Sequence, residues 1–166
     1  MIERIHLYDL EIVEIEGEFK EIKRNEETLP GMLTNHSLYV GKRDGLLETS
    51  LTKELYNIIG AFEKTGVDPK AVTEEGLEEY GVEMFKALAD VADEDKIMKV
   101  IYLSLIGANP RLEYTFEDFA LKYHGDFEEK METYVSLIST LASKDNNFRL
   151  EFENKTSQKR GKGEKK

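Results

Sequence analysis

The residue types that most often perform chemistry are sparse in this sequence, and their spacing does not form a recognisable site. The three histidines, His6, His36 and His124, lie far apart along the chain. None belongs to an HxxxH or HExxH pattern, the spacing that places two metal ligands on one face of a helix. We therefore expect surface or capping histidines rather than a histidine-based metal centre.

The acidic and glycine-containing segments also lack the patterns of cation and phosphate sites. The run Asp93, Glu94, Asp95 resembles a fragment of a calcium-binding loop, but the Gly and the distant Glu of such a loop are missing. An acidic helix start explains it better. Gly161 and Gly163 lack the spacing and the following Ser or Thr of a phosphate-binding loop, and no GxSxG occurs. The sequence thus predicts a protein that is not an enzyme and needs no cofactor or metal. A small hydrolase with an unrecognised site stays open as an alternative.

Length, cysteine content and charge narrow the class of protein. The chain has 166 residues and no cysteine, so we expect one domain without disulfides, which suits a reducing cytoplasm. The formal net charge is −11, and residues 155–166 contain six Lys or Arg and one Glu, which leaves −16 on residues 1–154. So acidic a body should repel nucleic acid and anionic membranes. The basic tail could contact either, but a solubilising, disordered terminus is the simpler interpretation.

The sequence also lacks the patterns of a signal peptide and of a membrane-spanning segment. The first residues do not combine a basic segment with an apolar run, so we expect no signal peptide. No apolar run reaches the roughly twenty residues that cross a bilayer. We therefore expect neither nucleic acid nor membrane among the partners.

Residues 1–24 have the pattern of a β-hairpin. Two apolar-rich stretches, 10–15 and 19–23, flank Gly17, which can adopt the positive φ of a tight turn. Ile12, Val13 and Ile15 point to both faces of such a ribbon, so one face could pack on helices and the other on a neighbouring strand or chain. Residues 25–30 are predicted to form a loop that ends in a Pro-Gly break.

From residue 32 the apolar period becomes helical, and residues 32–143 form the expected helical part. Its centre is an apolar helix that starts at the acids 93–95 and is stopped by Gly107, with apolar groups on most sides. Further helices are expected over about 35–44, 50–65, 73–91, 115–124 and 126–142, with caps at Thr34 or Asn35, Thr49 or Ser50, Thr115, and Asp126.

The predicted fold is α+β and predominantly α-helical, with an N-terminal β-hairpin packed on a bundle of about five to six helices. Residues 1–154 form a single domain, in which 144–154 are a short docked segment. Residues 155–166 contain no apolar residue and are expected to be a disordered basic tail.

Several short segments follow one another in a distinctive order. They are an acidic, aromatic-containing hairpin at 7–14, Leu-Pro-Gly-Met-Leu-Thr-Asn at 29–35, Asp-Gly-Leu-Leu at 44–47 before Ser50, Leu-Ala-Asp-Val-Ala-Asp at 88–93, Thr-Phe-Glu-Asp-Phe-Ala at 115–120, and Asn-Asn-Phe at 146–148 before the lysine-rich end. In this layout, which covers nearly the whole chain, the sequence resembles the tail assembly chaperones of long-tailed phages and prophages of Gram-positive bacteria.

The resemblance implies a specific role. Such chaperones are small, acidic, mostly helical proteins of the bacterial host's cytoplasm. They bind the tape measure protein, keep it soluble while tail tube subunits polymerise around it, and are absent from the finished virion. Many also occur in a longer, frameshifted form, through which the tail tube protein becomes a further expected partner.

The candidate contacts with the client lie on two helical faces. They are Met84, Phe85 and Leu88 on the predicted helix 73–91, and Phe127, Met131, Tyr134 and Ile138 on the last helix. Aromatic and methionine side chains form adaptable interfaces, although the same spacing also suits a core. Helix-in-groove contact is the expected mode, and the edge of the hairpin favours self-association. The alternative is a structural head–tail or tail component that is retained in the virion.

Overall fold

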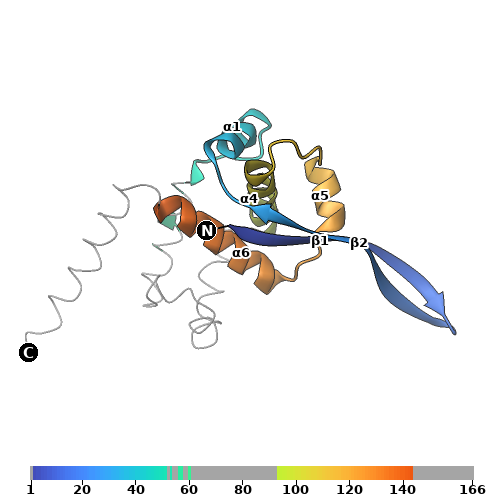
Figure 1. Ribbon diagram of the computed structural model, residues 1–166. Coiled ribbons are helices and arrows are strands. Elements are labelled where there is room, and N and C mark those ends of the chain that lie inside the picture. The colour runs from blue at the N-terminus through green and yellow to red at the C-terminus, as the bar shows by residue number, and fades with distance from the viewer. Residues whose placement is uncertain (1, 52, 54–55, 58–59, 61–92, 144–166) are drawn as a thin grey trace, which may run out of the picture.

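The computed structural model describes residues 2–51, 53, 56–57, 60 and 93–143 of the chain. Its elements are β1 (Glu3–Ile15), β2 (Glu18–Gly31), α1 (Asn35–Arg43), α4 (Glu94–Ala108), α5 (Phe116–Lys122) and α6 (Phe127–Ser143). Residues 51, 53, 56, 57 and 60 are also helical. Figure 1 shows these helices gathered at one end of the hairpin, whose other end extends away from them.

β1 and β2 form the predicted antiparallel hairpin with its tight turn at Gly17, and the structure gives this turn two residues. Ile15 lies opposite Glu18, and the turn residues Glu16 and Gly17 have φ values of 57° and 81°. Two successive positive φ values characterise the type I′ turn, whose twist matches that of the strands it connects.

The second strand is longer than predicted. Residues 25–30, predicted as a loop, continue β2, and the pairing ends only where Glu3 lies opposite Gly31. Pro30 is compatible with this position because an edge strand tolerates a residue without an N–H. The register shifts once, between Leu7 and Asp9. A β-bulge therefore absorbs the irregular residues instead of ending the strand.

The apolar helix α4 is the centre of the core, as predicted. Its N-cap is Asp93, whose side chain accepts a hydrogen bond from the Lys96 N–H. Buried apolar side chains lie on several of its sides, namely Ile97, Val100, Ile101, Leu103, Leu105 and Ile106. Side chains from β1, α5 and α6 complete the same cluster, among them Ile5, Leu7, Phe119 and Met131.

The prediction that Gly107 stops this helix is wrong. Gly107 lies within α4, which ends at Ala108. A Cβ at position 107 would lie 2.1 Å from the Met32 carbonyl oxygen, so the glycine is needed for close packing. The Met32 N–H donates a 2.8 Å hydrogen bond to the Ser104 carbonyl. The chain that leaves β2 therefore crosses α4 in direct backbone contact.

The predicted helix starts are confirmed in the described part of the chain. Where two caps were open, hydrogen bonds select Thr34 over Asn35 and Ser50 over Thr49. Thr115 forms the predicted capping box with Asp118, and Asp126 accepts a hydrogen bond from the Glu129 N–H. α5 ends at Lys122, two residues before the predicted end of this helix at about residue 124.

The described residues thus contain an N-terminal antiparallel hairpin and the four helices α1, α4, α5 and α6. This confirms the α+β class with its N-terminal hairpin. The larger helical bundle is not confirmed, because the predicted helix 73–91 lies outside the described residues. The segment 144–154 and the tail 155–166 lie outside them as well.

Candidate functional site: a projecting hairpin arm

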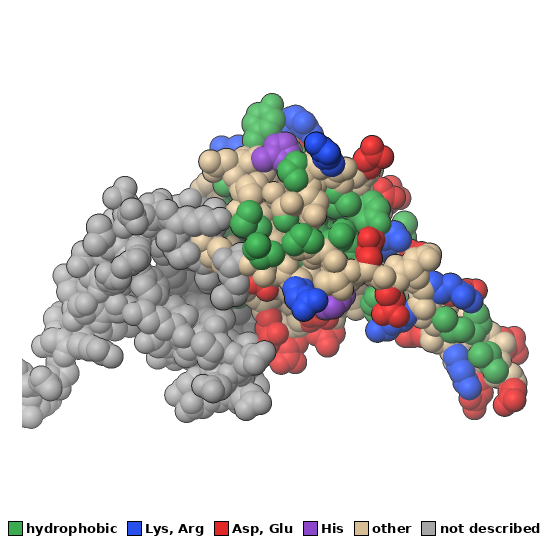
Figure 2. Space-filling view, viewed as in Figure 1, with side chains coloured by type: hydrophobic (Ala, Val, Ile, Leu, Met, Phe, Trp, Pro, Cys, Tyr) green, Lys and Arg blue, Asp and Glu red, His purple; other side chains and the backbone are tan. Residues whose placement is uncertain are grey.

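The two halves of the hairpin have different surroundings. In the half that packs on the helices, Ile5 and Leu7 are both 1 % exposed. In the other half, Ile12 is 64 % and Phe19 78 % exposed. We call residues 9–24 the arm. Figure 1 shows the arm extending beyond the helices, and Figure 2 shows hydrophobic side chains on its surface between acidic and basic ones.

Both faces of the arm carry apolar side chains. Residues opposite each other on paired strands share a face, and successive pairs alternate between the two faces. One face contains the pairs Leu10–Lys23, Ile12–Glu21 and Glu14–Phe19, and the other contains Glu11–Ile22, Val13–Lys20 and Ile15–Glu18. A two-stranded ribbon in water is marginally stable by itself. A partner that covers either face would therefore stabilise the arm.

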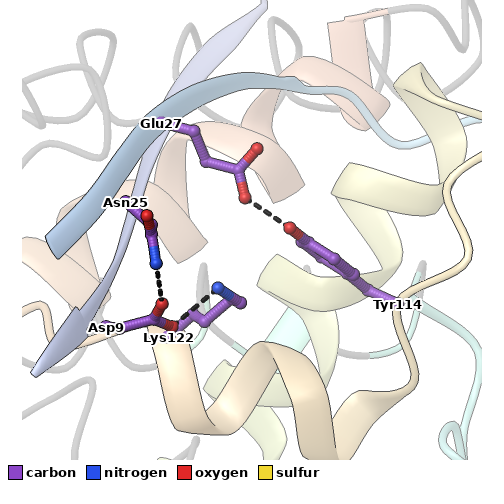
Figure 3. A network of polar contacts seen from close by, with 5 residues as sticks. All are labelled: Asp9, Asn25, Glu27, Tyr114 and Lys122. Carbon is purple, nitrogen blue, oxygen red and sulfur yellow. Dashed lines mark hydrogen bonds and ion pairs between the residues drawn. The ribbon is translucent and has the colours of Figure 1, made fainter.

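Polar contacts hold the base of the arm against α5 and the segment before it (Figure 3). Asp9 accepts 2.7 Å hydrogen bonds from the Asn25 amide and from the Lys122 ammonium group. Asn25 has a φ of 50° and lies at the bulge, so its side chain joins the two strands where their register shifts. The Tyr114 hydroxyl donates a 2.5 Å hydrogen bond to Glu27 of β2.

Contacts between aromatic rings also hold the base of the arm against the helices. We call this region, where the arm meets α5 and its flanking residues, the joint. The rings of Tyr8 and His124 have their centroids 4.8 Å apart. The Lys23 ammonium group lies 4.5 Å from the centre of the Tyr8 ring, within the range of a cation–π contact. Tyr8 lies between the two residues where the register shifts. The joint thus combines both strands, α5 and the residues that flank α5.

The electrostatics of the joint indicate fixed charges rather than proton transfer. Hydrogen bonds from Asn25 and Lys122 lower the pKa of Asp9 below its usual value, and Asp9 raises the pKa of Lys122. Both shifts move the groups away from neutral pH, whereas a general acid or base is tuned toward the working pH. The hydrogen bond to Glu27 similarly raises the pKa of the Tyr114 phenol. We interpret the network as an anchor that orients the arm.

The structure describes four of the seven side chains predicted to contact a client. Met131, Tyr134 and Ile138 are 0 % exposed, so in this structure they belong to the core and not to an outer face. Phe127, at the start of α6, is 45 % exposed. The other three, Met84, Phe85 and Leu88, lie outside the described residues. The structure therefore brings none of the predicted helical contacts together on its described surface.

The apolar stripe on α6 was assigned to the wrong environment. A helical period of apolar residues identifies the face that is buried, but it does not distinguish burial in a core from burial in an interface. The sequence predicts a neighbouring strand or chain against one face of the hairpin, but none of the seven predicted client contacts lies on the arm. Apolar residues at 10, 12, 13, 15, 19 and 22 occupy both faces of a ribbon, and the core can cover only one of them.

The rest of the described part of the chain contains weaker candidates for a functional site. A surface pocket beside the start of α4 is lined by Leu46, Leu47, Glu48, Thr49, Leu51, Asp93, Asp95, Lys96 and Lys99. Within it Lys99 is paired with Asp95 at 2.5 Å. The described residues contain no group of three or more His, Cys, Asp or Glu side chains arranged to hold a metal ion. Among their helices, none combines the length and the apolar composition needed to cross a bilayer.

A scan against protein-family models, a search of curated proteins and a search of solved structures found no significant match to this chain.

Proposed function

We propose that this chain is a non-enzymatic phage tail assembly chaperone that binds the tape measure protein in the cytoplasm of the bacterial host. The observation that carries the proposal is the arm, which exposes apolar side chains on both faces of an otherwise acidic chain. The layout of the sequence supports it independently. In this role the chaperone leaves the tail before the virion is complete.

The chemistry of such a client fits this surface. A long helical chain with apolar stripes aggregates when its stripes meet those of other copies. The exposed Ile12 and Phe19 can cover part of a stripe, while the net charge of −16 on residues 1–154 keeps the complexes apart. Phe127 is a further candidate contact from the predicted set. The buried Met131, Tyr134 and Ile138 have no part in the proposed contact surface.

Co-expression with the tape measure protein of the same phage or prophage tests the proposal. We expect the wild-type chain to keep the client soluble and to co-purify with it. The double variant I12S/F19S should lose at least about 90 % of the client, because two exposed apolar contacts at about 1 kcal/mol or more each correspond to tenfold or greater weakening.

Tyr39→Ser is the matched control, because Tyr39 on α1 is as exposed as Ile12 but lies off the arm. It should retain the client. An insoluble client in the presence of the wild-type chain would overturn the proposed function. Equal loss with both variants would remove the arm as its contact surface.

The second candidate is a structural head–tail or tail component. The observation in its favour is that a hairpin projecting from a helical body is suited to permanent strand pairing with a neighbouring subunit. Mass spectrometry of purified particles separates the two functions. The chaperone should be missing from the particles, and a stoichiometric presence would establish the structural component instead.

A further inference from the structure

The two outer edges of the arm differ in charge. Along β1 the charged residues of the arm are all acidic, namely Asp9, Glu11 and Glu14. Along β2 acidic and basic residues are mixed, in the order Glu18, Lys20, Glu21, Lys23 and Arg24. Among the described elements the sheet consists of these two strands, so each strand has an outer edge with N–H and C=O groups available for pairing.

We propose that the outer edge of β2 pairs with the same edge of a second copy of this chain, in an antiparallel and two-fold symmetric dimer. The β1 edge is less suited to such pairing, because all charged residues of the arm on this strand are acidic and no register can place opposite charges across it. The mixed charges of β2 can be complementary to themselves. The result is a four-stranded sheet, which exceeds the three strands that independent stability requires.

The shape of the chain favours this pairing as well. In one chain the helices lie at one end of the hairpin (Figure 1). Two antiparallel β2 strands direct their arms in opposite directions, so the two helical bodies would lie at opposite ends of the dimer's sheet. An antiparallel pairing of β2 with the β1 edge of another copy would place both bodies at the same end. Their separation would then be about 10 Å, twice the strand spacing and only the width of one helix.

Symmetry restricts the register. A two-fold axis perpendicular to the sheet keeps every side chain on its own face, so one residue must lie opposite its own copy. A centre at Lys20 places two ammonium groups opposite each other without any opposite-charge pair between the strands. A centre at Ile22 pairs Glu21 with Lys23, but it also places Lys20 opposite Arg24. In neither of these two registers do the opposite-charge pairs outnumber the like-charge pairs.

Of the three centres that pair five or more residues of 18–24, Glu21 pairs the whole stretch and gives the most favourable charge pattern. It places Glu18 opposite Arg24 of the second copy, and symmetry repeats this pair. Arg24 already forms an ion pair with Glu11 across the hairpin, and its guanidinium group has donors left for a second carboxylate. The one like-charge contact is between Glu21 and its copy, next to Lys23. The dimer depends only on the arm and is independent of the proposed function.

Charge exchange tests the pairing in the full chain. We expect sedimentation of the wild type to show a monomer–dimer equilibrium. Glu18→Arg and Arg24→Glu, each alone, should weaken dimerisation by on the order of tenfold, because each creates two like-charge pairs. An equimolar mixture of the two variants should regain a 1:1 dimer, since position 18 of each copy then faces the opposite charge at position 24 of the other.

Glu14→Arg is the matched control, with the same change of charge on β1, and it should dimerise like the wild type. A wild-type chain that is monomeric at all concentrations, or equal weakening by Glu14→Arg and Glu18→Arg, would overturn the proposal.

Cross-linking tests the register itself. The chain has no cysteine, so any disulfide in a Glu21→Cys variant joins position 21 of two copies. Opposite residues have Cα atoms about 4.5–5.5 Å apart, within the range that a disulfide spans. We expect rapid oxidation of Glu21→Cys to a covalent dimer and slow oxidation of Glu14→Cys. Glu21→Gln, which removes the like-charge contact, should tighten the dimer severalfold. Equal oxidation of the two cysteine variants, or weaker dimerisation of Glu21→Gln, would exclude this register.

Discussion

At the scale of single residues, two glycines show how closely the chain packs against itself. A Cβ at Gly107 would meet the Met32 carbonyl oxygen at 2.1 Å, whereas a Cβ at Gly41 would meet side-chain carbons of Leu103 and Leu47 at 2.7 Å. Side chains can rotate away from such contacts, but a backbone oxygen in a crossing segment moves only with its chain. The same mutation should therefore have different effects at the two sites.

We expect Gly107→Ala to lower the free energy of unfolding by about 2 kcal/mol or more, because overpacking against backbone forces a shift of the 31–33 segment or of α4. Gly41→Ala should cost less, since the displaced atoms are the ends of leucine side chains. Urea denaturation followed by circular dichroism measures both values. An equal loss of unfolding free energy in the two variants would contradict the close backbone contact between Met32 and α4.

At the scale of elements, the arm is one continuous hairpin with the half that packs on the helices, and the joint between them is polar. Asp9 lies at this joint and is held by Asn25 and by Lys122 of α5. Since both partners lower the pKa of Asp9, the folded protein stabilises its ionised form. The resulting stability is fully present above the unfolded pKa of about 3.9 and is lost as the pH falls through the lower folded pKa.

The difference in unfolding free energy between the wild type and Asp9→Asn should therefore be larger at pH 6 than at pH 2. Only the wild type has an ionised carboxylate to lose at this position. Chemical denaturation of both proteins at several pH values measures this difference. A difference that stays constant, or that grows toward acid pH, would show that the Asp9–Lys122 pair does not anchor the arm.

At the scale of the whole molecule, the exposed apolar side chains of the arm do not belong to the hydrophobic core. The core contains side chains from β1, α4, α5 and α6, and the helical residue Leu51 also belongs to it. The exposed apolar side chains of the arm, Leu10, Ile12, Ile15 and Phe19, are absent from it. The fold of the helical body should therefore not depend on the arm.

We expect a chain in which residues 10–23 are replaced by Asn-Gly to retain its helical circular dichroism. Its melting temperature should stay within about 4 °C of the wild type, because little buried apolar surface is lost. Asp9 and Arg24, opposite each other in the hairpin, allow the two-residue turn. Ile5→Ala, in the buried half of β1, should instead cost about 2–5 kcal/mol. An unfolded truncated chain would show that the arm is part of the folding unit.

The sequence predicted the parts of the fold that depend on neighbouring residues. The turn at Gly17, the apolar helix over residues 97–106 and the caps at Thr115 and Asp126 were identified from local patterns, and the cap of α1 was narrowed to Thr34 or Asn35. Each depends on contacts within a few residues, namely a positive φ, an apolar period or a side chain that accepts a nearby N–H. Predictions of this kind succeed because the partners are adjacent in the chain.

Features that depend on distant partners were decided only by the tertiary structure. Residues 25–30 became strand because β1 supplies a partner across a bulge. Gly107 serves close packing inside α4, because the backbone of Met32 crosses the helix at this position. Met131, Tyr134 and Ile138 became core because β1 and α4 occupy the space beside α6, and the arm stayed exposed because the core ends at its base. Composition and local pattern determine which side chains are apolar, but the arrangement of the elements decides which of them remain available to a partner.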